Sequence, residues 1–225
     1  IKYLLLKNSI ESTNSKTQSW IIRNYSDDME QLAIARELGF QPLKHYQCWD
    51  IRSDIIKKKY ERKSSKFTQN FVWNNITKST APLLLQLGKA GDSALLRQIL
   101  DRQPIDILDR AKPGSGLITI KKDSTITAIA GIISRGNSFN RKCYELIRDF
   151  AWDNRIEQLL PTILYELIMR DEHISIETQI EDEKLSNALS DYGLVKNREM
   201  LLLGRTLWRR QPNREIIKGT KYHRD

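Results

Sequence analysis

The sequence predicts an α/β fold in which a mixed, mostly antiparallel sheet is flanked by helices. It also predicts two copies of this fold in tandem, the first of them incomplete. Two observations support this prediction: short apolar segments typical of strands alternate with segments of helical spacing, and one helix–strand pattern occurs twice. The chain of 225 residues is 40% hydrophobic and 29% charged, which suits a folded core rather than a disordered chain.

Residues 1–52 are expected to form the C-terminal half of a first domain. Its elements are, in order, the end of a helix at 1–10, a strand at 19–25, a helix at 28–38 and a strand at 45–51. Ser26 or Asp27 is expected to cap the second helix, with Glu30 at capping-box spacing from Asp27. Gly39 is expected to end that helix, because glycine tolerates the left-handed conformation that follows many helices.

Positive charge is concentrated in two segments, residues 53–80 and 210–225, which we expect to be a basic linker and a basic tail. The net charge of the chain is +9, and residues 53–80 hold seven basic against two acidic side chains. Residues 57–66 therefore favour an acidic partner such as RNA or a membrane surface, although a solvated linker has the same composition. Phe67, Phe71, Val72 and Trp73 are too apolar for a pure linker, and we expect them either to form a strand or to cover a surface.

Residues 81–209 are expected to form a second, complete domain. Its helices are expected from 92 or 93 to about 101, at 105–111, at 156–169 and at 183–192. Its strands are expected at 83–87, 117–121, 127–133, 143–150, 174–178 and 199–208. The helix at 156–169 is the most strongly amphipathic of these segments.

The two predicted domains share a local pattern. LAIARELGF (32–40) and SNALSDYGL (186–194) are similar, each follows a strand, and each precedes a strand with a Trp at its end, Trp49 or Trp208. Gly39 corresponds to Gly193 at a separation of 154 residues. A single repeat at this distance indicates a domain duplication rather than a solenoid.

The order of elements in residues 81–209, together with the ARELGF segment, resembles the GCN5-related N-acetyltransferase family. The resemblance covers 81–209 as a whole domain and 1–52 as a C-terminal half. It implies acetyl-CoA as cofactor, an amine-bearing small molecule or protein as acceptor, and transfer of an acetyl group to that amine. Members of the family hold the pyrophosphate of coenzyme A on a glycine-rich turn at the start of the long helix, where backbone N–H groups face the anion.

The resemblance places this turn at Asn154, Arg155 and Ile156, which we expect to be the cofactor-binding residues. The sequence departs from the family here, because residues 152–158 contain no glycine. The position of the family's catalytic tyrosine is Ala35 in the first unit and Leu189 in the second. We therefore predict that the second domain is degenerate, and that an active copy would have its cofactor loop upstream of Ile1 in a longer protein. The alternative is a non-catalytic binding or dimerisation module, with nucleic acid contacting its basic linker.

Other candidate sites were weighed against ordinary structural roles. A carboxylate among Glu177, Glu181, Asp182 and Glu183 is a candidate for receiving an amine substrate or for acting as a base through water. An ordinary loop followed by a helix start explains the same residues. Cys143 is expected to be a core residue rather than a nucleophile. Three histidines and two cysteines favour neither a metal site nor a disulfide framework. With no apolar run of the length of a membrane span and no leader, we expect a cytoplasmic protein, compatible with a homodimer.

Overall fold

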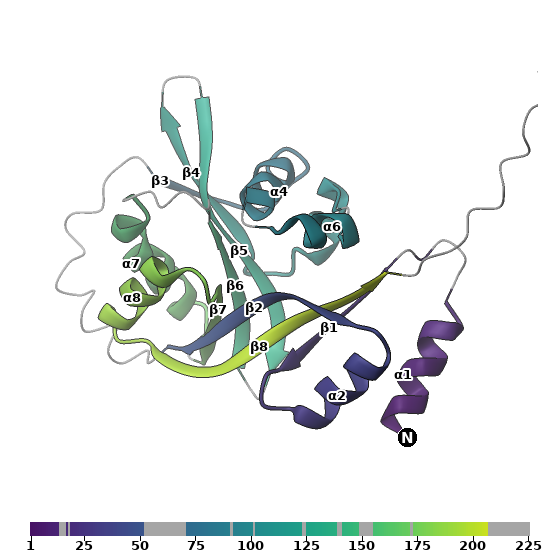
Figure 1. The fold of residues 1–225 in the computed structure, drawn as a ribbon. Coiled ribbons are helices and arrows are strands. Elements are labelled where there is room, and N and C mark those ends of the chain that lie inside the picture. The colour runs from purple at the N-terminus through teal and green to yellow at the C-terminus, as the bar shows by residue number, and fades with distance from the viewer. Residues whose placement is uncertain are drawn as a thin grey trace, which may run out of the picture.

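The computed structural model describes residues 1–13, 17, 19–51, 71–90, 92–100, 102–122, 125–138, 141–148, 155–171 and 173–206. These residues form one eight-stranded sheet flanked by helices (Figure 1). The strands are β1 (Ser19–Tyr25), β2 (Gln41–Asp50), β3 (Phe71–Asn74), β4 (Gly116–Lys122), β5 (Thr125–Ser138), β6 (Arg141–Arg148), β7 (Ile174–Gln179) and β8 (Val195–Thr206). The helices are α1 (Lys2–Glu11), α2 (Met29–Glu37), α4 (Ala81–Ala90), α5 (Ala94–Ile99), α6 (Pro104–Arg110), α7 (Arg155–Ile168) and α8 (Glu183–Asp191).

The order of the strands in the sheet is β1-β8-β2-β7-β6-β5-β4-β3. Every neighbouring pair is antiparallel except β6 and β7, which run parallel. The predicted mixed, mostly antiparallel sheet with flanking helices is thus confirmed. The predicted first unit contributes β1 and β2 to the same sheet as the second, and β2 lies between β7 and β8. Whether the chain consists of two tandem copies stays a prediction.

Helices cover both faces of the sheet because each buried strand alternates its apolar side chains between the two. On β6, Leu146 packs with the residues of α7 and α8, whereas Ile147 packs with those of α4 and α6. On β8, Leu203 packs with α1 and α2, whereas Leu202 packs with α5. As a result α1, α2, α7 and α8 share one face, and α4, α5 and α6 cover the other.

Two segments of the sheet have the same succession of elements. We call residues 1–51 (α1, β1, α2, β2) the N-terminal half-unit and residues 155–206 (α7, β7, α8, β8) the C-terminal half-unit. Asp28 and Asp182 each cap the following helix through the side chain, and the offset of 154 residues between them also separates Gly39 from Gly193. Both glycines have positive φ, at 79° and 86°, as a left-handed helix end requires.

The strand register follows the same offset. Tyr25 pairs with Met200 between β1 and β8, and the corresponding residues, Gln179 and Tyr46, pair between β7 and β2. Tyr46 and Met200 also pair with each other between β2 and β8. The strand pairing is therefore symmetric with respect to the two half-units. The first strand of each half-unit pairs with the last strand of the other, β1 with β8 and β7 with β2.

Two local predictions were wrong. Residues 83–87 lie in helix α4, not in a strand, because a short apolar run fits a buried helix equally well, and Pro82 suits the first turn of a helix. The cap of α2 is Asp28 rather than Ser26 or Asp27: Asp28 Oδ1 accepts the Gln31 N–H at 3.1 Å. The other helices and strands expected within the described residues are present, with some shifted ends.

Part of the predicted linker is a strand. Residues 71–74 form β3, one of the two alternatives expected for the apolar side chains there, and β3 pairs with β4. The basic segment 57–66, Phe67, the tail at 210–225 and Trp208 lie outside the described residues, so the acidic partner remains a prediction. Within the described part of the chain, no helix combines the length and apolar character that a membrane crossing needs.

Candidate active site

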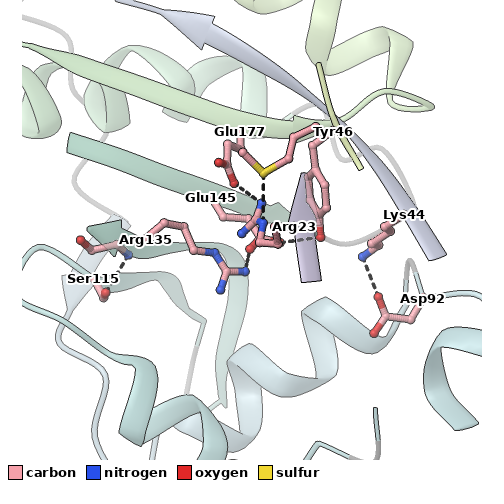
Figure 2. A network of polar contacts seen from close by, with 10 residues as sticks. Arg23, Lys44, Tyr46, Asp92, Ser115, Arg135, Glu145 and Glu177 are labelled. Atoms are coloured by element: carbon pink, nitrogen blue, oxygen red, sulfur yellow. Dashed lines mark hydrogen bonds and ion pairs between the residues drawn. The ribbon is translucent and has the colours of Figure 1, made fainter. Parts of the chain in front are cut away.

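The parallel pairing between β6 and β7 stops before either strand ends. Its last pair is Glu145 with Glu177, while β6 continues to Arg148 and β7 to Gln179. Directly paired residues of neighbouring strands project to the same face, so the two carboxylates lie close together (Figure 2). Glu145 is 4% exposed and Glu177 is 3% exposed. Two carboxylates this deeply buried require cations or hydrogen-bond donors.

Residues of three other strands supply those partners. Arg23 of β1 forms an ion pair with Oε2 of Glu177, and Arg135 of β5 forms one with Oε2 of Glu145. The hydroxyl of Tyr46, on β2, donates to Oε1 of Glu145 at 3.2 Å. We call these five residues the polar network. It joins five strands from two distant parts of the sequence, β1 and β2 from one and β5, β6 and β7 from the other, on one face of the sheet (Figure 2).

The cations of the polar network are held by further contacts. Arg23 donates through Nε to Met200 Sδ at 3.1 Å, and its guanidinium lies 5.0 Å from the centroid of the Tyr46 ring. Arg135 lies at a β-bulge, where the register between β5 and β6 shifts between Ser134 and Gly136. Bulges redirect a side chain away from the regular alternation of a strand, so Arg135 can reach Glu145.

A second buried ion pair lies beside the network. Lys44 of β2 donates to Oδ1 of Asp92 at 2.6 Å, and their side chains are 9% and 4% exposed. Burial lowers the pKa of Lys44, and the hydrogen bond to Asp92 acts against this shift. Asp92 lies just before α5, so this pair connects the helical layer to the sheet.

Burial shifts the pKa of three groups here. It raises the pKa of Tyr46, so the phenol stays protonated and remains a donor. It lowers the pKa of Arg135 to about 10, with the nearby cation of Arg23 acting in the same direction; at neutral pH Arg135 is still a cation. It also raises the pKa of Cys48 to about 12, and the charge of Glu177 adds to this rise. The Cys48 thiol is therefore not a nucleophile at neutral pH.

The predicted cofactor residues lie at the start of α7. The helix begins at Arg155, and Ile156 follows within its first turn. Asn154 lies outside the described residues, and for Arg155 and Ile156 the structure describes the backbone alone. What the structure provides at the predicted position is a helix N-terminus of a 14-residue helix.

The structure separates the four acidic residues that sequence analysis grouped. Glu177 belongs to the polar network. Asp182 caps α8 by accepting the Leu185 N–H at 3.1 Å, and it forms an ion pair with Arg148. Glu181 and Glu183 are exposed. Only Glu177 of the four is a buried carboxylate among other ionisable side chains.

Sequence analysis missed the other members of the polar network. Glu145 and Glu177 each interrupt an apolar strand, in CYELI and ISIET, and a carboxylate within such a strand is a signal that could have been used. No local signal identifies Arg23 or Tyr46, because their partners are more than 90 residues away. Among the described residues, no cluster of three or more His, Cys, Asp or Glu side chains is arranged to hold a metal ion.

Comparison with known proteins identifies the fold. No family model and no curated protein matches the sequence. Among solved structures, the chain is similar to a GNAT-family acetyltransferase from Novosphingobium aromaticivorans, with 10% identity and a TM-score of 0.53 over 88% of this chain and 79% of that one. It is also similar to a GCN5-related N-acetyltransferase from Kribbella flavida, with 9% identity and a TM-score of 0.52 over 90% and 74% of the two chains. The chain thus has the GCN5-related N-acetyltransferase fold.

The structural neighbours differ in how much of their length the chain matches. It covers 64% of a GCN5-related N-acetyltransferase from Sphaerobacter thermophilus, at 7% identity and a TM-score of 0.48. At such identities the likeness extends to the arrangement of helices and strands and not to the side chains of a site.

Proposed function

We propose that this protein transfers an acetyl group from acetyl-CoA to an amine acceptor, with the polar network as its active site. The observation that carries the proposal is the pair of buried carboxylates, Glu145 and Glu177, at the point where the pairing of β6 and β7 stops. The fold shared with N-acetyltransferases agrees with it. An ammonium must lose a proton before its nitrogen can attack an acyl group, and a positioned carboxylate can take that proton.

Glu177 is the carboxylate that we assign as proton acceptor. Both oxygens of Glu145 are engaged, Oε1 by Tyr46 and Oε2 by Arg135. For Glu177 the contact within the described residues is from Arg23 to Oε2, which leaves Oε1 for the acceptor's proton. Glu145, Tyr46 and Arg135 then act as positioning residues, which hold the neighbouring charge in place.

Acetyl-CoA would supply an acyl group already activated as a thioester. The residues that would hold its pyrophosphate are Arg155 and Ile156, through their backbone N–H groups at the start of α7, with Asn154 before them. A helix N-terminus suits an anion because its first N–H groups lack partners within the helix and carry partial positive charge. The backbone at the start of this helix therefore suits a phosphate. Because glycine is absent, the phosphates would lie farther from the backbone than they do in a glycine-rich turn.

We also propose that residues 1–52 and 81–209 arose by duplication of one domain, with the first copy incomplete and the second degenerate in its cofactor turn. The constant offset of 154 residues in caps, glycines and register supports this. The polar network draws Arg23 and Tyr46 from one unit and Glu145 and Glu177 from the other. A single site built by both units follows, rather than one site in each. A cytoplasmic location and a homodimer stay predictions.

The test is a calorimetric titration of the chain with acetyl-CoA at two salt concentrations, followed by assays with a panel of primary amines. We expect saturable binding that survives moderate salt. Replacing Glu177 with Gln should lower kcat/KM by about 10²- to 10⁴-fold, the usual contribution of a general base. The exposed Glu37→Gln on α2 is the control and should leave kcat/KM unchanged.

Two results would contradict this proposal. No binding at either salt concentration would favour a non-catalytic module. Binding of acetyl-CoA that disappears at moderate salt would mean that basic segments attract the phosphates without a specific site.

A further inference from the structure

A pocket of about 150 Å³ lies on the opposite face of the sheet from the polar network. It is bordered by β2, α8 and β8, and its lining residues are Gln47, Ile180, Glu183, Ser186, Asn187 and Lys196. Gln47 pairs with Thr178 of β7, whose hydroxyl accepts a hydrogen bond from Trp49 in the core beneath α7 and α8. The pocket is therefore on the α8 side, and it shares no residue with the proposed active site.

One side-chain oxygen in the wall of the pocket has no hydrogen-bond donor. Gln47 is 5% exposed, and its Nε2 donates to the carbonyl oxygens of Cys48 and Arg198 at 3.0 and 3.3 Å. Within the described part of the chain, no group donates to its Oε1. The Oε1 atom is therefore available to a donor on a ligand.

The equivalent place in the N-terminal half-unit is filled by apolar side chains. At the offset of 154 residues, Ser186 corresponds to Leu32 and Gln47 corresponds to Leu201. Leu32 and Leu201 both pack against the cluster formed by α1, α2 and β8. The fold thus accommodates leucines at both positions, whereas Ser186 and Gln47 give this pocket polar walls.

Opposite charges border the pocket. Lys196 reaches it from β8 with its Nζ 5.4 Å from the centroid of a Trp49 ring, and Glu183 reaches it from the first turn of α8. Lys196 suits a carboxylate, whereas Glu183 and the free oxygen of Gln47 suit an ammonium group. A cavity of about 150 Å³ can hold a molecule of roughly six to ten heavy atoms, since an engineered cavity of that size binds benzene.

We propose that this pocket binds a small α-amino acid, with its carboxylate at Lys196 and its ammonium at Glu183 and Gln47 Oε1. Ser186 and Asn187 then offer hydrogen bonds to a short polar side chain, and Ile180 offers an apolar contact. This site is independent of the proposed acetyl transfer, because it lies on the other face of the sheet and needs no cofactor.

The test is a titration of the full 225-residue chain with glycine, L-alanine and L-serine, followed by NMR or calorimetry. Ethanolamine and acetate serve as probes that carry only one of the two charges. We expect saturable binding of at least one amino acid and binding of each single-charge probe weaker by about tenfold or more, the loss of one good polar contact. No saturable binding of the three amino acids, or equal binding of a single-charge probe, would overturn the proposal.

Variants locate the binding. Ser186→Leu copies Leu32 of the other half-unit and should fill the pocket, abolishing binding while the thermal midpoint is kept. Ser190→Leu places the same side chain on the exposed part of α8 and should leave binding unchanged. Lys196→Met, which does not alter the core, should weaken binding by about tenfold or more. Amino-acid binding that is unchanged in both Ser186→Leu and Lys196→Met would show that the ligand sits elsewhere.

Discussion

The two half-units share their backbone but not the side chains at the centre of the sheet. Arg23 of β1 occupies the position that Glu177 occupies in β7, and these two residues form an ion pair with each other. Tyr46 of β2 likewise corresponds to Met200 of β8, and both contact Arg23. The equivalent positions 23 and 177 thus carry opposite charges, and their side chains meet where the two half-units join.

The features that the half-units keep in common are those that shape the chain. Asp28 and Asp182 cap the helices, Gly39 and Gly193 end them, and Leu189 is fully buried at the position of the buried Ala35. The features that differ are polar side chains at the junction and on the wall of the pocket. The comparison indicates that the shared caps and glycines shape both half-units, and that the chemistry depends on the positions at which their side chains differ.

The largest effect is expected from variants that exchange the charges of Arg23 and Glu177. Arg23→Glu and Glu177→Arg each place like charges together in a buried site, and each should lower the unfolding free energy by about 3 kcal/mol or more. The double variant restores an ion pair between the same positions, so it should lose much less than the sum of the two. Urea unfolding of the four proteins measures this coupling.

An exposed ion pair provides the matched control. Lys2 and Glu30 join α1 to α2 at 2.8 Å, with both side chains more than half exposed. Their charge exchange should show no measurable coupling, because water screens such pairs. If the coupling energy between Arg23 and Glu177 were as small as that between Lys2 and Glu30, then Arg23 and Glu177 would not be held together in the folded protein.

The sequence was sufficient for the local structure of the half-units. Gly39, Gly193 and the apolar spacing of residues 156–169 predicted helices whose ends agree with α2, α8 and α7 to within two residues. These signals act over a few residues, through backbone conformation and amphipathic burial. The prediction for the run at 83–87 failed because an apolar run of five residues is too short for its spacing to distinguish a helix from a strand.

The pairing of the strands, and with it the site, could not be predicted in the same way. The repeat predicted a duplication, but it did not indicate that β2 pairs with both β7 and β8. That pairing brings Tyr46 to Glu145 across 99 positions. Pairing over such distances depends on the packing of the whole sheet, not on residues near either strand, so Glu177 was a candidate in the sequence but its partners were not.

The helix caps give a second, smaller contrast. Asp28 and Asp182 cap α2 and α8 in the same way, but Asp182 also pairs with Arg148, whose side chain is 10% exposed. Replacing either residue by alanine should cost about 1 kcal/mol for the lost cap, and Asp182→Ala should cost about 1–2 kcal/mol more for the lost ion pair. Thermal unfolding of the two variants measures the difference.

Asparagine separates the two contributions, because it caps a helix as well as aspartate does. Asp28→Asn should therefore be close to the parent protein, whereas Asp182→Asn should retain the extra loss. Equal stability of the two asparagine variants would show that the ion pair with Arg148 adds nothing beyond the cap.

The smallest contrast appears at alkaline pH. Cys48 of β2 corresponds to Leu202 of β8, and both are buried, but only the thiol can ionise. Burial and the charge of Glu177 raise its pKa from 9.0 to about 12. Between these values the unfolded chain loses the thiol proton and the folded chain keeps it, so the unfolding free energy falls as pH rises, by up to about 1.4 kcal/mol per pH unit.

Cys48→Ala removes this titration and should reduce the slope of the unfolding free energy against pH by about one proton between pH 9 and 10. Tyr46, whose pKa burial also raises, still contributes above pH 10, so the range below it isolates the thiol. Urea unfolding at half-unit pH intervals measures the slope. Alkylation should agree: at pH 8 the shifted pKa leaves about a thousandfold less thiolate than an unshifted one. The prediction would be contradicted by an unchanged slope in Cys48→Ala together with rapid alkylation of the native thiol. These results would show that Cys48 is open to water, unlike the buried Leu202.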